Sequence, residues 1–187
     1  MPGIGHNRGP SMDDGRAVRI YTWKHAQAAR RESLTVEQVR RRRTRAAELG
    51  MSYATYASVR ATAGRDVDAL VFTSNALGLQ GGGPLDRSWA ERLAGIRRCL
   101  RIGLLSAPLD PVEMAEVLPL DRVYRAPPAH ASWPALRAAL ARVQEGRPAS
   151  SFVLVGRAPW EEGWVAAGRL GAYLAAGTYL GGALDRA

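Results

Sequence analysis

Neutral hydrogen-bonding side chains and one arginine follow short apolar runs in the last two-thirds of the chain. Residues that directly follow the strands of a parallel sheet share one edge, where ligands of open α/β sheets bind. Hydroxyl and amide groups beside one cation would hold a phosphate or another anion without reacting with it. A competing interpretation is that these residues only cap strands and helices. The predicted ligand-binding rim consists of Thr73, Ser74, Asn75, Ser106 and Arg157.

Side chains that commonly act as nucleophiles, general bases and metal ligands are sparse. Cys99 is the single cysteine, and the three histidines are His6, His25 and His130. This set suggests no Ser-His-Asp triad, no Cys-His pair and no cysteine-built zinc site. We expect Cys99 to be a small core residue, and we predict no catalytic residue, no metal ligand and no cofactor.

Four apolar runs and a weaker fifth alternate with segments of helical period. The runs lack the polar–apolar alternation of half-exposed strands, so they favour strands that are covered on both faces. This order of elements predicts an α/β fold, a three-layer domain with a mostly parallel sheet. The predicted strands are 69–72, 102–105, 122–124, 152–155 and the weaker 178–180.

Apolar residues three or four positions apart mark the helices between these strands. Trp89, Trp133, Trp160 and Trp164 begin or occupy such faces, and we expect them to anchor the core. The last helix is expected to continue to Leu174.

Positive charge is concentrated in the first third of the 187-residue chain, which has a formal net charge of +9. Residues 1–65 carry 13 Lys and Arg against 5 Asp and Glu, a balance of +8, whereas residues 66–187 carry +1. Such a local excess attracts polyanions, so DNA or RNA is an expected partner, with a protein as the alternative. No apolar run approaches the length of a membrane span, and we expect a cytoplasmic protein.

Turn residues and helical periodicity divide the first third of the chain. Residues 1–17 have no apolar period and predict a flexible tail. A helix is expected over 35–49, Gly50 is suited to end it, and Ser52 would cap a second helix that extends to about residue 62. We therefore predict three parts: the tail 1–17, a basic helical module at 18–65, and an α/β domain at 66–187.

Residues 46–60, AAELGMSYATYASVR, resemble the helix-turn-helix of the lactose-repressor family. The resemblance lies in Ala46, in Gly50 four residues later, in the run from Ser52 to Thr55, and in the inward apolar Val59. It implies base contacts from the start of the second helix and phosphate contacts from the arginines. The alternative is a helical hairpin packed on the α/β domain with a solvated arginine face. The implied nucleic-acid residues are Arg40, Arg41, Arg42, Arg43, Arg45, Ser52, Tyr53, Thr55 and Arg60.

Residues 66–180 resemble the haloacid-dehalogenase-like hydrolase superfamily in the order of their elements. Residues 71–79, VFTSNALGL, stand where the first family motif carries its two aspartates, and 104–108, LLSAP, stand at the second motif. Residues 153–174 resemble the fourth motif, a strand ending in glycine followed by acidic residues and a helix. The resemblance implies the same layered scaffold.

The departures from these motifs concern the reacting groups. Thr73 stands at the position of the nucleophile and Asn75 at that of the acid/base, so neither carboxylate is present. Arg157 replaces the first carboxylate of the fourth motif, and Glu161 remains at the second, which is a poor donor set for Mg²⁺. Because no aspartyl-phosphate can form on Thr73, we expect no phosphatase activity of the family type.

These observations favour a non-catalytic binding or regulatory protein that contacts DNA or RNA through its basic helical module. Two alternatives remain open. One is a phospho-ligand-binding protein or unconventional hydrolase that uses the strand-end rim, and the other is a protein-interaction module.

Overall fold

The structure, a computed structural model, describes residues 34–81 and 83–181, and the predicted tail 1–17 lies outside them. The described residues form seven α-helices and a five-stranded sheet with α/β character. The helices are α2 (Val36–Glu48), α3 (Tyr53–Ala63), α4 (Arg87–Gly95), α5 (Pro111–Val117), α6 (Trp133–Gln144), α7 (Glu162–Gly168) and α8 (Ala176–Gly181). The strands are β1 (Ala69–Thr73), β2 (Leu100–Leu105), β3 (Arg122–Arg125), β4 (Phe152–Gly156) and β5 (Ala172–Ala175). None of the described helices combines the length and apolar character needed to cross a membrane.

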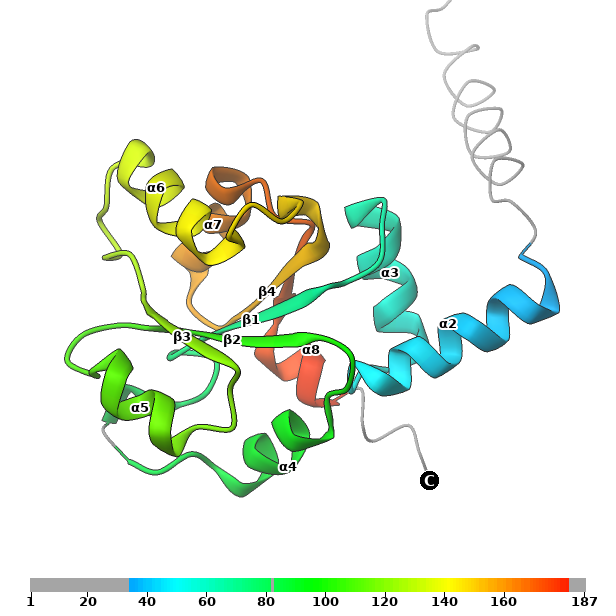
Figure 1. Cartoon of the computed structure of the whole chain (residues 1–187), viewed down its shortest axis with the longest axis horizontal. Coiled ribbons are helices and arrows are strands. Elements are labelled where there is room, and N and C mark those ends of the chain that lie inside the picture. The colour runs from blue at the N-terminus through cyan, green and yellow to red at the C-terminus, as the bar shows by residue number, and fades with distance from the viewer. Residues whose placement is uncertain (1–33, 82, 182–187) are drawn as a thin grey trace, which may run out of the picture. The chain divides into compact units, whose positions relative to one another are not determined.

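The sheet is parallel throughout and has the strand order β3-β2-β1-β4-β5 (Figure 1). The first strand is therefore central, and Ala69 pairs with Leu100 on one side and with Phe152 on the other. Every residue of β1 and β4 is buried, as the uninterrupted apolar runs predicted. The predicted α/β fold with a parallel sheet is confirmed.

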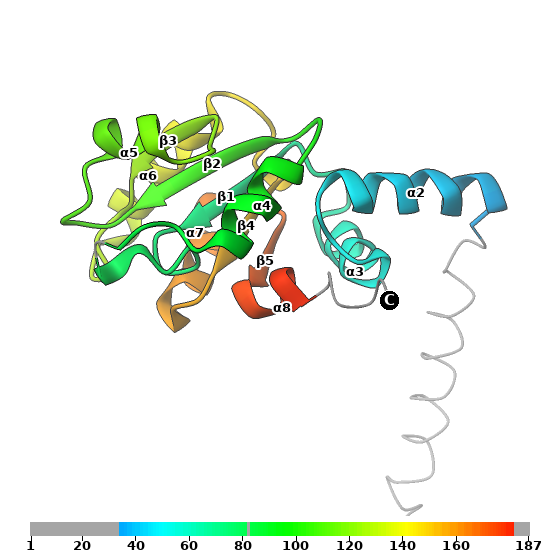
Figure 2. The ribbon, with the colours of Figure 1, turned by 90° about the horizontal axis from the view of Figure 1, so that it is seen from below.

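Helices cover both faces of the sheet and complete three layers (Figures 1 and 2). Successive side chains of a strand point to opposite faces, so Leu70 and Phe72 pack in one core with α4 and α8. Ala69 and Val71 pack in the other core, with α6 and α7. The carboxyl ends of the strands are left free to present the residues that follow them.

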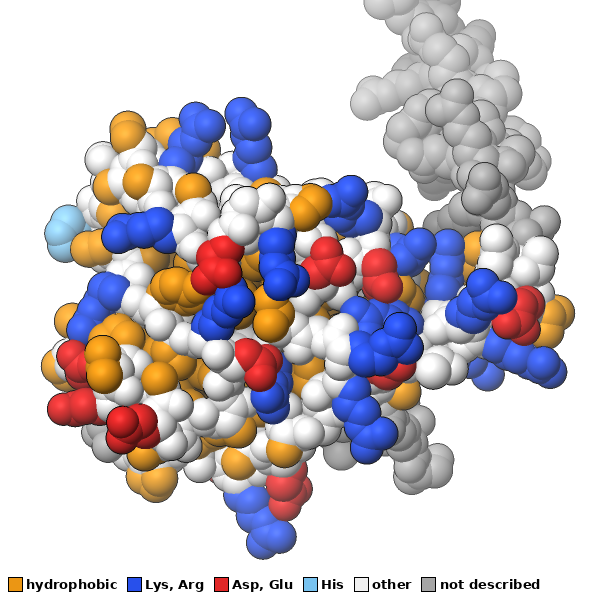
Figure 3. All heavy atoms as spheres, in the orientation of Figure 1, with side chains coloured by type: hydrophobic (Ala, Val, Ile, Leu, Met, Phe, Trp, Pro, Cys, Tyr) orange, Lys and Arg blue, Asp and Glu red, His pale blue; other side chains and the backbone are white. Residues whose placement is uncertain are grey.

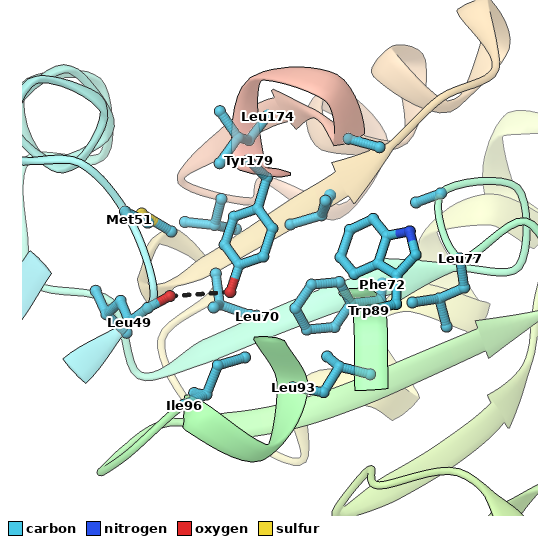
Figure 4. Packing of buried hydrophobic residues seen from close by; sticks show 14 of the residues in the cluster. Leu49, Met51, Leu70, Phe72, Leu77, Trp89, Leu93, Ile96, Leu174 and Tyr179 are labelled. Atoms are coloured by element: carbon cyan, nitrogen blue, oxygen red, sulfur yellow. Dashed lines mark hydrogen bonds between the residues drawn. The ribbon is translucent and has the colours of Figure 1, made fainter. Parts of the chain in front are cut away.

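Three aromatic rings pack together in the core that contains residues of α4 and α8 (Figure 4). Trp89 and Tyr179 stack with ring centroids 5.8 Å apart, and Phe72 meets both rings edge-on. The hydroxyl of Tyr179 donates a 2.9 Å hydrogen bond to the carbonyl of Leu49. Burial raises the pKa of Tyr179, so this hydroxyl keeps its proton and remains a donor.

The turn between α2 and α3 belongs to the same core as the sheet. Leu49, Met51 and Tyr56 are almost fully buried against residues of β1, β4 and α8. Among the described residues, one compact unit begins at Arg40. Within it α3 packs on β5, so contacts cross the predicted domain boundary at residue 65, and that boundary stays a prediction.

The prediction for the end of the chain is wrong. Arg169 has the left-handed φ of 54°, which ends α7, and β5 follows where a continuing helix was expected. The predicted strand 178–180 lies inside α8. Leu174 instead pairs with Val155 of β4, so the neighbouring strand decides the conformation of this segment.

The prediction that four tryptophans anchor the core is wrong for two of them. Trp89 and Trp164 are buried, as expected from their helical spacing. Trp133 and Trp160 are 51% and 50% exposed, because they lie at the first turns of their helices, beyond the covered face.

Candidate functional site

A cavity of about 410 Å³ lies at the carboxyl ends of four strands. Residues that follow β1, β2, β3 and β4 line it, as expected for a ligand site of an open parallel sheet. Its polar lining comes from Ser74, Asn75, Gln80, Ser106 and Arg125. Prolines, alanines and the half-exposed ring of Trp160 form the apolar walls. The cavity thus offers neutral donors and acceptors, one cation and an aromatic surface.

Glu161 lies behind this cavity and is completely buried. Its Oε1 accepts from the Asn75 amide at 2.8 Å, and its Oε2 accepts from the backbone N–H groups of Arg157 and Ala158 at 2.8 and 2.9 Å. The side-chain amide of Gln80 in turn donates to the side-chain oxygen Oδ1 of Asn75. Both carboxylate oxygens are therefore used inside the fold, and the arrangement makes Glu161 a structural acceptor.

Three of the five predicted rim residues line the cavity: Ser74, Asn75 and Ser106. The Ser74 hydroxyl accepts from the Ser106 N–H at 3.1 Å, which ties the end of β1 to the end of β2. Thr73 is not at the cavity, because its buried hydroxyl accepts from the Ala76 N–H at 3.0 Å and closes the turn after β1. Arg157 has an exposed side chain outside the cavity lining.

Arg125 supplies the cation that the sequence analysis assigned to Arg157. It is the last residue of β3, and its guanidinium donates to the carbonyl of Leu109, which also lines the cavity. The strand-end rule applied to the third apolar run would have found it. No sequence signal pointed to Gln80, which reaches the cavity from the short 3₁₀ turn Leu79–Gly81.

Acidic residues do not gather into a cation site in the described part of the chain. No group of three or more His, Cys, Asp and Glu side chains there has a geometry that would hold a metal ion. Asp66 lies before β1 and binds Arg45 and Tyr56, whereas Glu161 lies beyond the opposite end of the sheet. The two carboxylates therefore do not converge.

Arg45 connects α2 to the start of the sheet. Its guanidinium donates to Asp66 at 3.1 Å, to Glu48 at 2.8 Å, and to the carbonyls of Val67 and Arg98 at 2.6 and 3.2 Å. Burial opposes its charge, but the hydrogen bond with Glu48 and the charge of Asp66 outweigh burial and raise the pKa of Arg45. Arg45, which the sequence predicted to contact phosphate, thus uses its guanidinium for hydrogen bonds within the protein.

Three more residues predicted to contact nucleic acid, Ser52, Thr55 and Arg60, also form hydrogen bonds or ion pairs within the protein. Arg60 lies 3.9 Å from Asp66 and donates to the hydroxyl of Tyr56 at 3.3 Å. Ser52 is the N-cap of α3, as predicted, and its hydroxyl accepts from the Thr55 N–H at 3.1 Å.

Tyr53 and the remaining arginines are exposed or only partly buried. The guanidinium of Arg43 lies over the Tyr53 ring, 5.9 Å from its centroid. Arg40, Arg41 and Arg43 are exposed, and Arg42 is partly buried.

A turn before β2 adds two arginines beside α2. The backbone N–H of Arg97 donates to the Glu48 carbonyl at 2.7 Å, and Arg98, whose side chain is 81% exposed, pairs with the Glu48 carboxylate at 3.3 Å. Figure 3 shows arginine side chains gathered over α2 and where α2 meets the sheet. We call these arginines the basic surface. Its members are Arg40, Arg41, Arg42, Arg43, Arg97 and Arg98.

Comparisons of the chain with protein-family models, with curated proteins and with solved structures found no match.

Proposed function

We propose that this chain is a non-catalytic binding protein that contacts DNA or RNA through the basic surface. The proposal rests on one observation: exposed arginines of α2 and of the turn at Arg97 and Arg98 share one surface because Arg45 and Glu48 bind the two segments together. Clustered arginines gain affinity for a phosphate backbone by releasing its counterions. We also propose a cytoplasmic location, where such a partner is accessible.

Fluorescence anisotropy with a labelled duplex at two salt concentrations tests this proposal. Reversing two charges in Arg40→Glu/Arg43→Glu should weaken binding by about tenfold or more and lower the salt-dependence slope by about 2. Arg137→Glu/Arg147→Glu makes the same change in net charge at exposed positions of the α6 region and should leave affinity within about threefold. Equal losses in both variants, or no binding by the unmodified protein, would contradict the proposal.

A second candidate function is the binding of a small phosphorylated ligand at the strand-end cavity. The observation that favours it is the joint lining of one cavity by Ser74, Asn75, Ser106 and Arg125, which combines hydroxyl and amide groups with a guanidinium. The hydrogen bond between Asn75 and Glu161 supports the proposal that the domain is a catalytically degenerate relative of the haloacid-dehalogenase-like superfamily, since it joins positions of the first and fourth motifs.

Calorimetric titration with inorganic phosphate and with a nucleoside monophosphate tests this candidate. Arg125→Ala should abolish measurable binding, because it removes the one cation of the described cavity lining. Arg157→Ala removes an exposed arginine beyond the cavity and should bind as the unmodified protein does. Absence of heat with both probes, or a loss confined to Arg157→Ala, would exclude a ligand in this cavity.

A further inference from the structure

Ser52 and Thr55, two of the three residues at the start of α3 that a helix-turn-helix would direct toward bases, hydrogen-bond within the protein. The hydroxyls of Ser52 and Thr55 lie 2.9 Å apart and bond to each other, and Ser52 also accepts the Thr55 N–H. The next turn of the helix directs Tyr56 and Val59 into the core. Reading base edges requires free donors and acceptors at such positions. Base contacts by Ser52 and Thr55 would compete with these hydrogen bonds.

Three arginines of the basic surface, Arg40, Arg97 and Arg98, differ from these groups in their exposure. Arg40 and Arg97 are exposed, and the Arg98 side chain pairs with Glu48 but is still 81% exposed. The α2 backbone and the turn that contains Arg97 are held together by the 2.7 Å bond between Arg97 and Glu48. The surface thus presents exposed charged side chains from two hydrogen-bonded backbone segments, a combination suited to phosphate oxygens.

The exposure of aromatic side chains near the basic surface indicates whether a duplex or a single strand is the preferred partner. Proteins that bind single strands without sequence preference stack bases on open aromatic faces. Near the basic surface, within the described residues, Tyr53 is partly buried and Arg43 covers its ring. Trp160 is half exposed but lines the cavity at the opposite ends of the strands. Because the described residues near the basic surface offer no open stacking platform, we expect their affinity to depend on phosphate density, which is about twice as high along a duplex as along one strand.

We infer that the basic surface binds the phosphate backbone of double-stranded nucleic acid without reading its base sequence. The inference rests on the proposed function and narrows it to one class of partner. It also separates this chain from a sequence-specific repressor, because recognition by charge alone gives affinity that is nearly equal for every sequence.

Anisotropy with three labelled probes of equal length tests the inference: an A·T-rich duplex, a G·C-rich duplex and single-stranded oligothymidine. The two duplexes should bind within about threefold of each other, the single strand about tenfold more weakly, and Arg40→Glu/Arg43→Glu should weaken both duplexes by the same factor. Thr55→Val should change neither affinity nor discrimination, although it would lower discrimination if α3 read bases.

The outcomes separate the inference from the proposed function. A preference above about tenfold for one duplex, or tighter binding of the single strand, overturns the inference and leaves nucleic-acid binding in place. Failure to bind all three probes overturns both.

Discussion

The amide of Asn75 donates a 2.8 Å hydrogen bond to the carboxylate of Glu161 across 86 residues of sequence. This bond joins the segment that follows the central strand β1 to the segment that follows β4. The remaining carboxylate oxygen accepts two backbone N–H groups, from Arg157 and Ala158. Glu161 therefore fixes the floor of the strand-end cavity.

Removal of the Glu161 carboxylate should destabilise the protein strongly. In Glu161→Ala, the Asn75 amide and two backbone N–H groups lose their acceptor in a buried place, and we expect a loss of about 3 kcal/mol or more in the free energy of unfolding. Glu161→Gln keeps one acceptor oxygen and should lose about half as much. Glu162→Gln, at the exposed neighbour, should change stability by less than about 0.5 kcal/mol. Urea unfolding measures all three, and equal stability of Glu161→Ala and Glu162→Gln would contradict the structural role.

The close approach of Tyr173 and Glu161 to the end of β4 requires a glycine. A Cβ on Gly156 would lie 2.6 Å from the ring of Tyr173 and 2.7 Å from a carboxylate oxygen of Glu161. We expect Gly156→Ala to cost about 2 kcal/mol of stability through overpacking. Gly163→Ala, in α7 with no atom within 4 Å of its added Cβ, should be neutral or stabilising by about 0.5 kcal/mol. Chemical denaturation of the matched pair checks this, and an unchanged Gly156→Ala would show that Tyr173 yields freely.

Arg45 should act as a structural residue. Its side chain is 16% exposed and bonds to two carboxylates and two carbonyls, so Arg45→Ala should lower the free energy of unfolding by about 2 kcal/mol. Arg45→Lys should recover only part of this loss, because an ammonium group cannot reproduce the planar fork. Arg40→Ala, at an exposed position of the same helix, should stay within about 0.5 kcal/mol. Thermal and urea unfolding report the difference, and equal effects at positions 40 and 45 would refute it.

Cys99 should be nearly inert in the folded protein. Burial raises the pKa of its thiol to about 12, whereas the thiol of an unfolded cysteine has a pKa of about 8.5. At a pH of about 9 the folded thiol is almost wholly protonated, so alkylation should be slower by at least about a hundredfold than in urea. Below a pH of about 8.5 the thiol is protonated in both states and burial of Cys99 costs no ionisation energy. As pH rises toward 12 the unfolded thiol ionises first, so the free energy of unfolding falls. Cys99→Ser provides the blank, and rapid labelling of the native protein would contradict the burial.

Local sequence patterns determined most elements of the fold, with β5 among the exceptions. Uninterrupted apolar runs predicted β1 to β4, and polar residues at caps, such as Ser52, predicted helix starts, because both signals act between residues close in the chain. The alternation of apolar runs with segments of helical period was sufficient to predict a parallel sheet. It also predicted that Ser74, Asn75 and Ser106 would share one edge.

Only the tertiary structure decided which of these side chains remain available. Arg45 and Arg40 are alike in sequence, yet Arg45 meets a carbonyl 53 residues away and Arg40 stays exposed. The same holds for Arg125, which lines the cavity, and Arg157, which does not. Sequence also misplaced β5, since pairing with β4 outweighs the local helical pattern. Burial and pairing depend on the path of the whole chain, whereas propensity depends on a few neighbouring residues.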